Sequence, residues 1–280
     1  MYFLDKHCSP NSSESNREFL EKVSKARQSL IDAAQGLVFE AETHKYFFYG
    51  IELPSVSAVV SKFAPFDSEG LALKCSKNPK HKLYGKPPEE ILQIWDELKN
   101  AAATAGTQVH EFGEACCDWR TGNPENITGQ YRKRITEQGL MAESPKEIAV
   151  ARWWNDLDTE RYIVVNKETR IVNPLLGYAG TFDLLLFDKV TGHFLLKDYK
   201  TNEDLFKSFG DHLQPPLNFI LANDVGKYTV QQNLYRIQLE NIGLTVDSAN
   251  LIWLKADSAY QEVEIDAKYR KAIEFALSTK

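Results

Sequence analysis

The stretch GTFDLLLFDKVTGHFLLKDYKT, residues 180–201, decides the expected fold. It contains two runs of aliphatic and aromatic residues that are typical of strands, and the dipeptide at 191–192 supplies turn chemistry between them. Side chains alternate faces along a strand, so Asp198 and Lys200 share one face of the second strand. A loop with an even number of residues makes Asp183 and Asp198 direct or diagonal neighbours, roughly 5–8 Å apart at their Cβ atoms. We therefore predict a hairpin that presents two carboxylates and one ammonium group together.

The elements around this hairpin predict a mixed α/β or α+β domain in which helices flank a central mixed β-sheet. A strand-like run at 162–172 precedes the hairpin and completes a meander of three strands. Two further strands are expected at 249–256 and 260–266. Helical periodicity and start signals predict the helices: one from Ser15, one from Pro88, a second after Gly106, one near 148–157, one at 228–239 and a last one at the end.

The N-terminal region is expected to be an accessory to this domain. An aromatic hairpin at 37–50 follows the first helix. We predict that residues 1–54 pack on a core domain formed by residues 55–280.

The bulk composition is that of an ordinary globular protein, with 43% hydrophobic and 26% charged residues among 280. No apolar run approaches membrane-spanning length, and residues 1–15 lack the apolar core of a secretory signal. We therefore expect a cytoplasmic protein without a membrane partner. The net charge of −6 argues against a protein that coats nucleic acid over its whole surface, but a local basic groove stays compatible with it. The four cysteines form no C-x-x-C pair and are expected to be idle thiols: Cys8, Cys75, Cys116 and Cys117.

A lysine-rich segment at 71–86 contains five lysines, one histidine and no acid. One interpretation is a solvated loop, because exposed lysines are common. The other is a phosphate-contacting arm in which Lys77, Lys80 and Lys82 guide a nucleic-acid strand.

The Asp183–Asp198–Lys200 group also has two interpretations. Charged residues are rare among core residues unless they are paired or bind a metal. One interpretation is a salt bridge between Lys200 and one aspartate at a strand end. The other is a site for a hard divalent cation, Mg²⁺ or Mn²⁺, which prefers oxygen ligands at this spacing.

Four motifs favour the metal site: GTQVHEFGE at 106–114, GYAGTFDLLL at 177–186, KDYKTN at 197–202 and QQNLY at 231–235. In this order the chain resembles the PD-(D/E)xK nuclease superfamily, particularly its RecB-like branch with phage exonuclease and CRISPR-associated relatives. The resemblance runs from about residue 55 to the end and implies a restriction-endonuclease-like core. Asp198 stands where many members have Glu. No cysteine follows Cys117, so we expect no iron–sulfur cluster.

The resemblance implies the roles of the site residues. Asp183, Asp198, the backbone carbonyl of Tyr199 and His110 are the expected metal ligands, and Lys200 is the expected catalytic lysine. Gln231 and Tyr235, one helical turn apart, correspond to a pair that braces the site and contacts the scissile strand, although Tyr235 can equally be a core residue. Further residues have weaker assignments: Glu114 orienting His110, Glu168 bracing the site or lying exposed, and Thr201 and Asn202 contacting phosphate.

We therefore predict a metal-dependent nuclease that hydrolyses DNA, a single strand or a duplex end, as an exonuclease in recombination, repair or phage DNA metabolism. A homo-oligomer or a recombination partner protein is compatible with this function. The alternatives are a structure-specific endonuclease, an RNA nuclease and a non-catalytic module that binds DNA ends. The presence of Asp183, Asp198 and Lys200 together disfavours the last, because a scaffold does not need all three.

Overall fold

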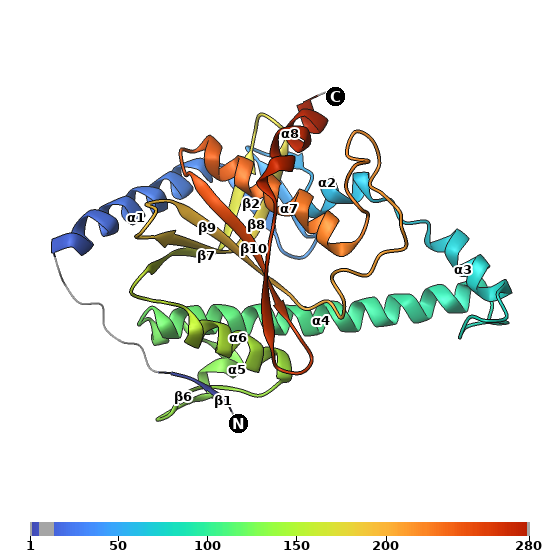
Figure 1. Cartoon of the computed structure of the whole chain (residues 1–280), viewed down its shortest axis with the longest axis horizontal. Coiled ribbons are helices and arrows are strands. Elements are labelled where there is room, and N and C mark those ends of the chain that lie inside the picture. Colours follow the sequence, from blue (N-terminus) through green and yellow to red (C-terminus); the bar gives the residue numbers. More distant parts are fainter. Residues whose placement is uncertain (1, 6–13, 279–280) are drawn as a thin grey trace.

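A five-stranded mixed sheet forms the centre of the computed structural model, which describes residues 2–5 and 14–278 (Figure 1). The strand order is β11-β10-β9-β8-β7, antiparallel throughout except that β10 runs parallel to β9. The predicted meander and the two later strands are present: β7 (Tyr162–Asn173), β8 (Tyr178–Asp188), β9 (Phe194–Lys200), β10 (Val246–Leu254) and β11 (Tyr260–Glu264). The predicted mixed α and β architecture is confirmed.

Helices cover both faces of this sheet (Figure 1). One face carries four helices: α1 (Glu14–Ala33), α2 (Val56–Phe63), α7 (Asp224–Asn241) and α8 (Arg270–Ser278). The other face carries α4 (Pro88–Arg120) and α6 (Pro145–Asp156), with the short α5 (Gly129–Arg132) and η1 (Pro124–Asn126) beside them. α1 begins one residue earlier than predicted.

Strand β8 explains why the sheet is buried on both sides. Leu184 and Leu186 enter the core under α4 and α6, whereas Leu185 and Phe187 enter the core under α1, α2 and α7. A strand between two helical layers is apolar at successive positions rather than at alternate ones. An acidic residue within this strand is therefore placed in the centre of the molecule.

Helix α4 is one continuous helix of 33 residues, so the predicted division at Gly106 is wrong. An isolated glycine costs a helix only about 1 kcal/mol relative to alanine, and the flanking alanines favour the helix. Pro88 starts the helix and Glu89 and Glu90 occupy its first turn, as predicted. Residues 96–105 are exposed on every side of the helix.

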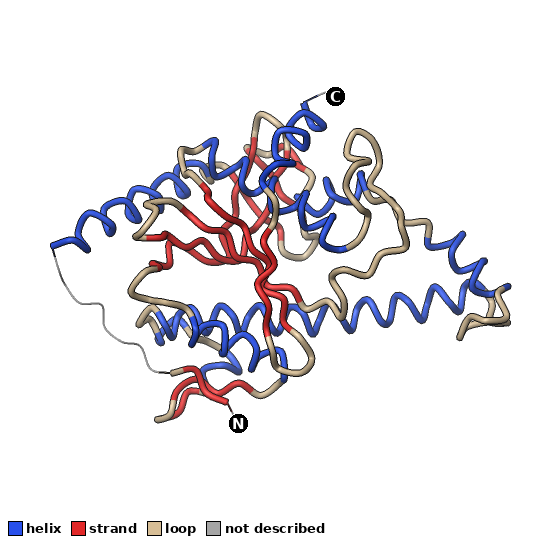
Figure 2. Tube along the Cα trace, in the orientation of Figure 1, coloured by secondary structure: helices blue, strands red, loops and turns tan. Residues whose placement is uncertain are grey.

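The N-terminal end of α4 extends away from the sheet as part of an arm (Figure 2). α3 (Ser68–Lys77) packs on it through a small core of Ala72, Cys75, Leu83 and Ile91. The prediction of a plain loop for residues 71–86 is thus wrong for its first half, which is helical because Asp67 caps the helix start and accepts from Gly70 N–H at 2.8 Å. We call residues 68–95 the arm.

The N-terminal region packs on the sheet through two elements. α1 places Val23, Ala26 and Leu30 in the same buried cluster as Val56 of α2. The predicted aromatic hairpin is present in a three-stranded sheet of β2 (Leu37–Glu40), β3 (Lys45–Phe48) and β4 (Ile51–Leu53). Apolar residues before and after residue 54 share one buried cluster. The division of the chain into two parts at residue 54 stays a prediction.

A small sheet joins the N-terminal residues to a segment near the middle of the chain. β1 (Tyr2–Leu4) pairs with β6 (Gly139–Ala142), which also pairs with β5 (Ile135–Thr136). This small sheet was not among the predicted elements. Cys75, Cys116 and Cys117 are buried and free of disulfides, whereas Cys8 lies outside the described residues. Among residues 2–5 and 14–278, no helix is both long and apolar enough to cross a membrane.

Candidate metal centre

Acidic residues occupy facing positions on the three neighbouring strands β7, β8 and β9. The pairing of β8 with β9 ends at Leu184 opposite Lys197, and continuing this register by one residue places Asp183 opposite Asp198. This is the direct one of the two arrangements, direct or diagonal, that the alternation pattern predicts for a loop with an even number of residues. Asp183 and Asp198 are both buried, at 9% and 2% exposure.

Glu168 extends this row onto β7. The register of β7 with β8 shifts by one residue between Val164 and Asn166, which is the signature of a β-bulge. After the shift, Lys167 faces Leu184 and Thr169 faces Phe182, so Glu168 lies opposite Asp183. We call Glu168, Asp183 and Asp198 the acidic row.

The backbone at Glu168 has a φ of 39°, in the left-handed region that non-glycine residues rarely adopt. Such a conformation costs free energy and persists where the surrounding structure imposes it, often at functional sites. The Glu168 side chain is 31% exposed, which is neither the fully exposed position nor the core position of an ordinary strand residue.

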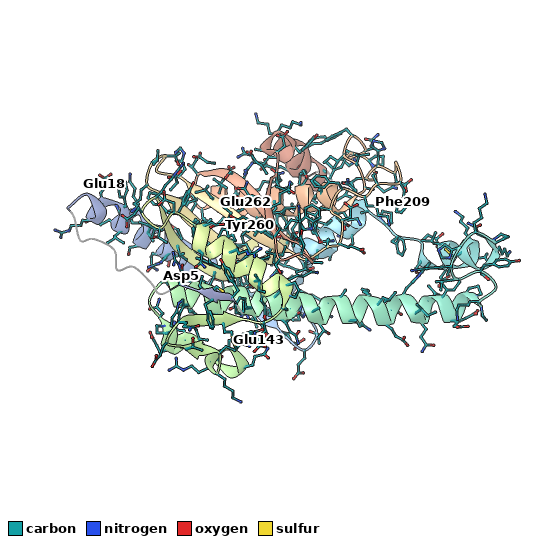
Figure 3. All side chains as sticks on the ribbon, turned by 60° about the horizontal axis from the view of Figure 1, so that its bottom comes forward. Asp5, Glu18, Glu143, Phe209, Tyr260 and Glu262 are labelled. Carbon is teal, nitrogen blue, oxygen red and sulfur yellow. The ribbon has the colours of Figure 1, made fainter. Side chains whose placement is uncertain are left out.

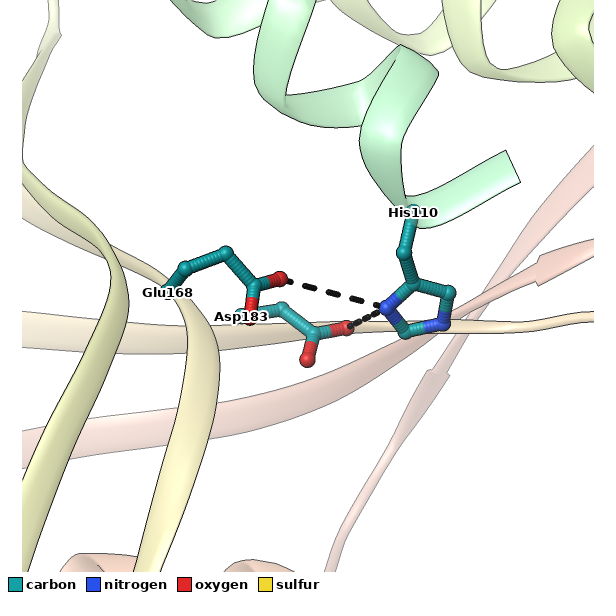
Figure 4. A group of neighbouring side chains, drawn as sticks. All are labelled: His110, Glu168 and Asp183. Atoms are coloured by element: carbon teal, nitrogen blue, oxygen red, sulfur yellow. Dashed lines mark ion pairs between the residues drawn. The ribbon is translucent and has the colours of Figure 1, made fainter. Parts of the chain in front are cut away.

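His110 approaches the acidic row from α4 (Figure 4). Its Nδ1 lies 3.2 Å from Asp183 Oδ2 and 4.0 Å from Glu168 Oε1. One ligand atom from each of His110, Glu168 and Asp183 lies within 4.8 Å of the others, so these three residues could hold one metal ion. Gly113 permits the close approach of the helix, because a Cβ there would lie 2.7 Å from the ring of Tyr199 on β9.

The acidic row has more negative charge than its surroundings stabilise. Burial, and then the neighbouring Asp183 carboxylate, raise the pKa of Glu168 to about 9. Burial, and then Asp198, raise the pKa of Asp183 to about 6, although His110, Lys200 and the Tyr199 N–H oppose the shift. That N–H donates to Asp183 Oδ2 at 2.8 Å. A cation at this position would relieve the repulsion between the carboxylates.

An unpartnered oxygen atom on α7 also fits a cation site. Gln231 Oε1 is buried and accepts no hydrogen bond from the described residues, whereas the buried Asp198 Oδ2 has Lys200 Nζ as its partner. Buried oxygen atoms without a donor are rare in folded proteins, because each has lost its interaction with water. Together with the histidine and the three carboxylates of the acidic row, it forms a donor set of the kind that Mg²⁺ or Mn²⁺ prefers.

Lys200 lies beside the acidic row and forms an ion pair with Asp198. Its ammonium group lies 4.3 Å from the ring centroid of Tyr228 on α7. Burial disfavours the charge, but the Asp198 carboxylate more than compensates, so the pKa of Lys200 is raised and the side chain stays charged. The salt bridge between Lys200 and one aspartate, which was the alternative to a metal site, is therefore present, and Asp198 is the aspartate. The three-residue group that could hold an ion is His110, Glu168 and Asp183, and the ligand roles of Asp198 and the Tyr199 carbonyl stay predictions.

Helix α7 covers the site from the other face of the sheet. Tyr235 is 3% exposed, and its ring lies 6.5 Å from that of Phe182 on β8. Gly180 makes room for it, because a Cβ there would lie 2.8 Å from the Tyr235 ring. Tyr235 is therefore a packed residue as well as a neighbour of the site. Its contact with a substrate, and that of Gln231, remain predictions.

Other residues singled out in the sequence have partners within the protein outside the acidic row. The Glu114 carboxylate lies 4.0 Å from Lys167 Nζ, and no hydrogen bond joins it to His110 among the described residues. Asn202 is engaged within the protein: its side chain donates to Asp224 at 2.7 Å and accepts from Tyr228 at 2.9 Å. The Thr201 carbonyl accepts from Lys146.

The three lysines of the proposed phosphate contact, Lys77, Lys80 and Lys82, are in the arm. Within the arm, α3 packs on α4 around Ile91, which is about 28 Å from His110 along the helix axis at 1.5 Å per residue. The structure places the three lysines at the far end of α4, and their contact with a nucleic-acid strand stays a prediction.

A large cavity that the sequence patterns do not predict is linked to the site through Asn202, two residues after Lys200. Its volume is about 740 Å³, and Asp224, the partner of Asn202, is part of its wall. Phe66 and Phe209 line it and are 70% and 85% exposed. Figure 3 shows Phe209 on the side of the body from which the arm extends. In the sequence, the signal for this cavity is that Phe66 and Phe209 stand in loop segments rich in polar residues. This signal does not show that the two residues line one cavity.

Comparisons with known proteins add a weak structural likeness. No protein-family model matches the chain, and no curated protein matches it. A solved structure of a protein from Eubacterium rectale, named "Putative exonuclease", aligns with 60% of this chain at 12% identity and a TM-score of 0.36. The alignment covers 63% of that protein, which is less than two thirds of its length. At this level of similarity the comparison carries no argument about function, and the proposal below rests on the site.

Proposed function

We propose that this chain is a metal-dependent nuclease that hydrolyses DNA phosphodiester bonds on a PD-(D/E)xK-type core, acting as an exonuclease. The observation that carries the proposal is the acidic row with His110 on one side and the charged Lys200 on the other. The order of the four sequence motifs supports the same assignment.

His110, Glu168 and Asp183 would hold Mg²⁺ or Mn²⁺, with Asp198 and the Tyr199 carbonyl as further oxygen ligands. A nitrogen ligand among carboxylates is compatible with Mn²⁺ in particular. When bound, the cation supplies Lewis-acid polarisation of a phosphoryl oxygen and a lowered pKa of a coordinated water.

The protein groups around the row have separate tasks. Lys200, held by Asp198 and by the face of Tyr228, keeps a positive charge where the phosphate would gain negative charge in the transition state. Asp183 is oriented by the Tyr199 N–H, and Gln231 offers its amide group from α7. Preorganised groups of this kind lower the barrier because they need no rearrangement during the reaction.

The surroundings of the site favour a substrate with unpaired bases. Phe66 and Phe209 offer exposed aromatic faces in the neighbouring cavity, with Lys207 at 5.6 Å from the Phe209 ring centroid. Aromatic side chains beside cationic groups bind single strands through base stacking and phosphate attraction. We therefore expect a single-stranded end, or an end that frays, to enter here.

The test compares a linear duplex and a linear single strand with nicked and sealed circles of the same sequence, in Mn²⁺. Stepwise loss from termini with intact sealed circles is the expected result. Rapid linearisation of sealed circles would instead identify an endonuclease, and cleavage confined to an RNA strand of the same sequence would identify an RNA nuclease. Binding of ends without any cleavage, in Mn²⁺ and Mg²⁺, would leave only the non-catalytic module.

A further inference from the structure

A second, basic cavity lies behind the C-terminal half of α7. Its volume is about 240 Å³, and it is bounded by α7, the first residue of β10 and the segment formed by η2 (Ala267–Tyr269) and α8. One acid, Glu240, lines it. The cavity is also lined by four cationic side chains: Arg236, Lys268, Arg270 and Lys271. None of them belongs to the candidate metal centre.

Arg236 is the unusual member of this group. It is only 2% exposed, and its Nε and Nη1 atoms are buried without a hydrogen-bond partner. Among residues 2–5 and 14–278, no ion pair within 4.0 Å involves Arg236, although arginine guanidinium groups are rarely buried without a partner. Burial, and then the neighbouring Arg270, lower the pKa of Arg236. The cavity wall therefore includes a buried guanidinium group whose Nε and Nη1 donors are unused.

The acids near Arg236 are occupied by other partners or lie too far away to pair with it. Asp247 contacts His193 at 2.7 Å, and Asp266 contacts Lys268 at 2.6 Å. Glu264 acts on Arg236 only through longer-range attraction. Glu240, the acid in the cavity wall, forms an ion pair with Arg270. No acid is thus left to neutralise Arg236 directly.

Lys271 adds a second unpaired charge. It is exposed at the cavity, and no ion pair involves it in the described part of the chain. A buried arginine and a free lysine that line one small cavity provide both directed donors and a mobile point charge. This combination suits an oxyanion with several acceptor oxygens, such as a phosphate group.

We propose that this cavity binds a phosphate group, with Arg236 as its central donor and Lys271 at its rim. The phosphate can come from a nucleic-acid backbone or from free phosphate or a mononucleotide. Its chemistry is the same in each case. The proposal does not depend on the nuclease assignment, because it uses none of the residues of the acidic row.

The test uses the full chain in metal-free buffer and measures binding of inorganic phosphate by calorimetry and thermal unfolding, against chloride at matched ionic strength. Wild type should bind phosphate and melt at a higher temperature in its presence. Lys271→Ala and Arg236→Met should each weaken phosphate binding. For Arg236→Met the dissociation constant should rise about tenfold or more, which corresponds to a loss of about 1.4 kcal/mol or more in binding free energy. Lys133→Ala, an exposed lysine on another part of the molecule, is the matched control and should bind phosphate as wild type does.

Arg236→Met has a second readout. Because it removes a buried charge without a partner, the phosphate-free variant should melt at or above the temperature of wild type. Should this variant fail to fold, Lys271→Ala and wild type still decide, because Lys271 is exposed and its loss does not disturb the core.

Two further ligands separate the sources of the phosphate. If a nucleoside monophosphate binds like inorganic phosphate, and a short single-stranded oligonucleotide binds equally well to wild type and Lys271→Ala, the site serves free phosphates. If oligonucleotide affinity falls in Lys271→Ala but not in Lys133→Ala, the site serves a backbone phosphate. The proposal is overturned if wild type shows no phosphate effect beyond that of chloride and both lysine variants bind the oligonucleotide alike, or if Arg236→Met binds phosphate as tightly as wild type.

Discussion

Glu168→Gln should stabilise the metal-free protein at pH 8 even though it removes a proposed metal ligand. The pKa of Glu168 is raised to about 9, first by burial and then by Asp183. In the unfolded chain a glutamate has a pKa of about 4.3. Between these values the folded state retains a proton that the unfolded state has lost, so the free energy of unfolding falls as the pH rises. Glutamine keeps the shape of the side chain and removes this dependence.

The size of the effect follows from the pH interval. From pH 5 to pH 8, a linkage of 1.36 kcal/mol per unit gives an upper bound of about 4 kcal/mol. Since 31% of the Glu168 side chain is exposed, water screens part of its repulsion with Asp183. We therefore expect a gain of about 1–2 kcal/mol, which for a chain of this size is a rise of about 2–3 °C in melting temperature.

The assay is thermal unfolding of wild type and Glu168→Gln at pH 5, 6.5 and 8, first without metal and then with saturating Mn²⁺. Without metal, the wild-type melting temperature should fall more steeply with pH than that of the variant. With Mn²⁺ the order at pH 8 should reverse, because the variant has lost a ligand and gains less from the ion. Glu160→Gln, at an exposed turn, is the control for loss of one carboxylate. If the variant melts below wild type at pH 8 without metal, or gains as much melting temperature from Mn²⁺ as wild type does, Glu168 is neither a source of repulsion nor a metal ligand.

Three further substitutions separate catalysis, metal binding and substrate guidance. Lys200→Ala should abolish DNA cleavage while calorimetry still detects Mn²⁺ binding, because lysine is no ligand; cleavage at the wild-type rate would show that the lysine assignment is wrong. His110→Ala should weaken Mn²⁺ affinity about 10–100-fold, within the range seen for altered metal sites. The cleavage rate at fixed Mn²⁺ should fall together with the affinity. An unchanged Mn²⁺ affinity would exclude His110 as a ligand. Replacing Lys77, Lys80 and Lys82 with alanine should raise KM and flatten the salt dependence of cleavage without altering Mn²⁺ affinity, and an unchanged salt slope would remove the arm from the substrate path.

The meander and the site on it could be predicted from local patterns. Alternation along β8 and β9, with a short turn between them, is sufficient to make Asp183 and Asp198 neighbours. The helical spacing of Gln231 and Tyr235 likewise appears in α7. These features depend on residues close together in the sequence.

Features that depend on distant packing could not be predicted. The role of Glu168 depends on the bulge after Val164, and without that shift of one residue Lys167 would face Asp183 instead. No residue pattern distinguishes a bulged strand from a regular one here. The continuity of α4 through Gly106, and the burial of Arg236 against the η2–α8 segment, also depend on contacts between segments far apart in the sequence.

DNA cleavage by wild type and Asp183→Asn across a Mn²⁺ titration tests whether the acidic row is the active site of a metal-dependent nuclease. The two proteins are prepared in parallel, and linear single-stranded and duplex DNA are labelled at one end. Wild type should cleave with a rate that saturates in Mn²⁺ and stops when the metal is chelated. Asp183→Asn should fold, melt without the Mn²⁺-dependent gain and leave both substrates intact. Equal cleavage by the two proteins, or no cleavage by wild type at saturating Mn²⁺ and Mg²⁺, would contradict the assignment.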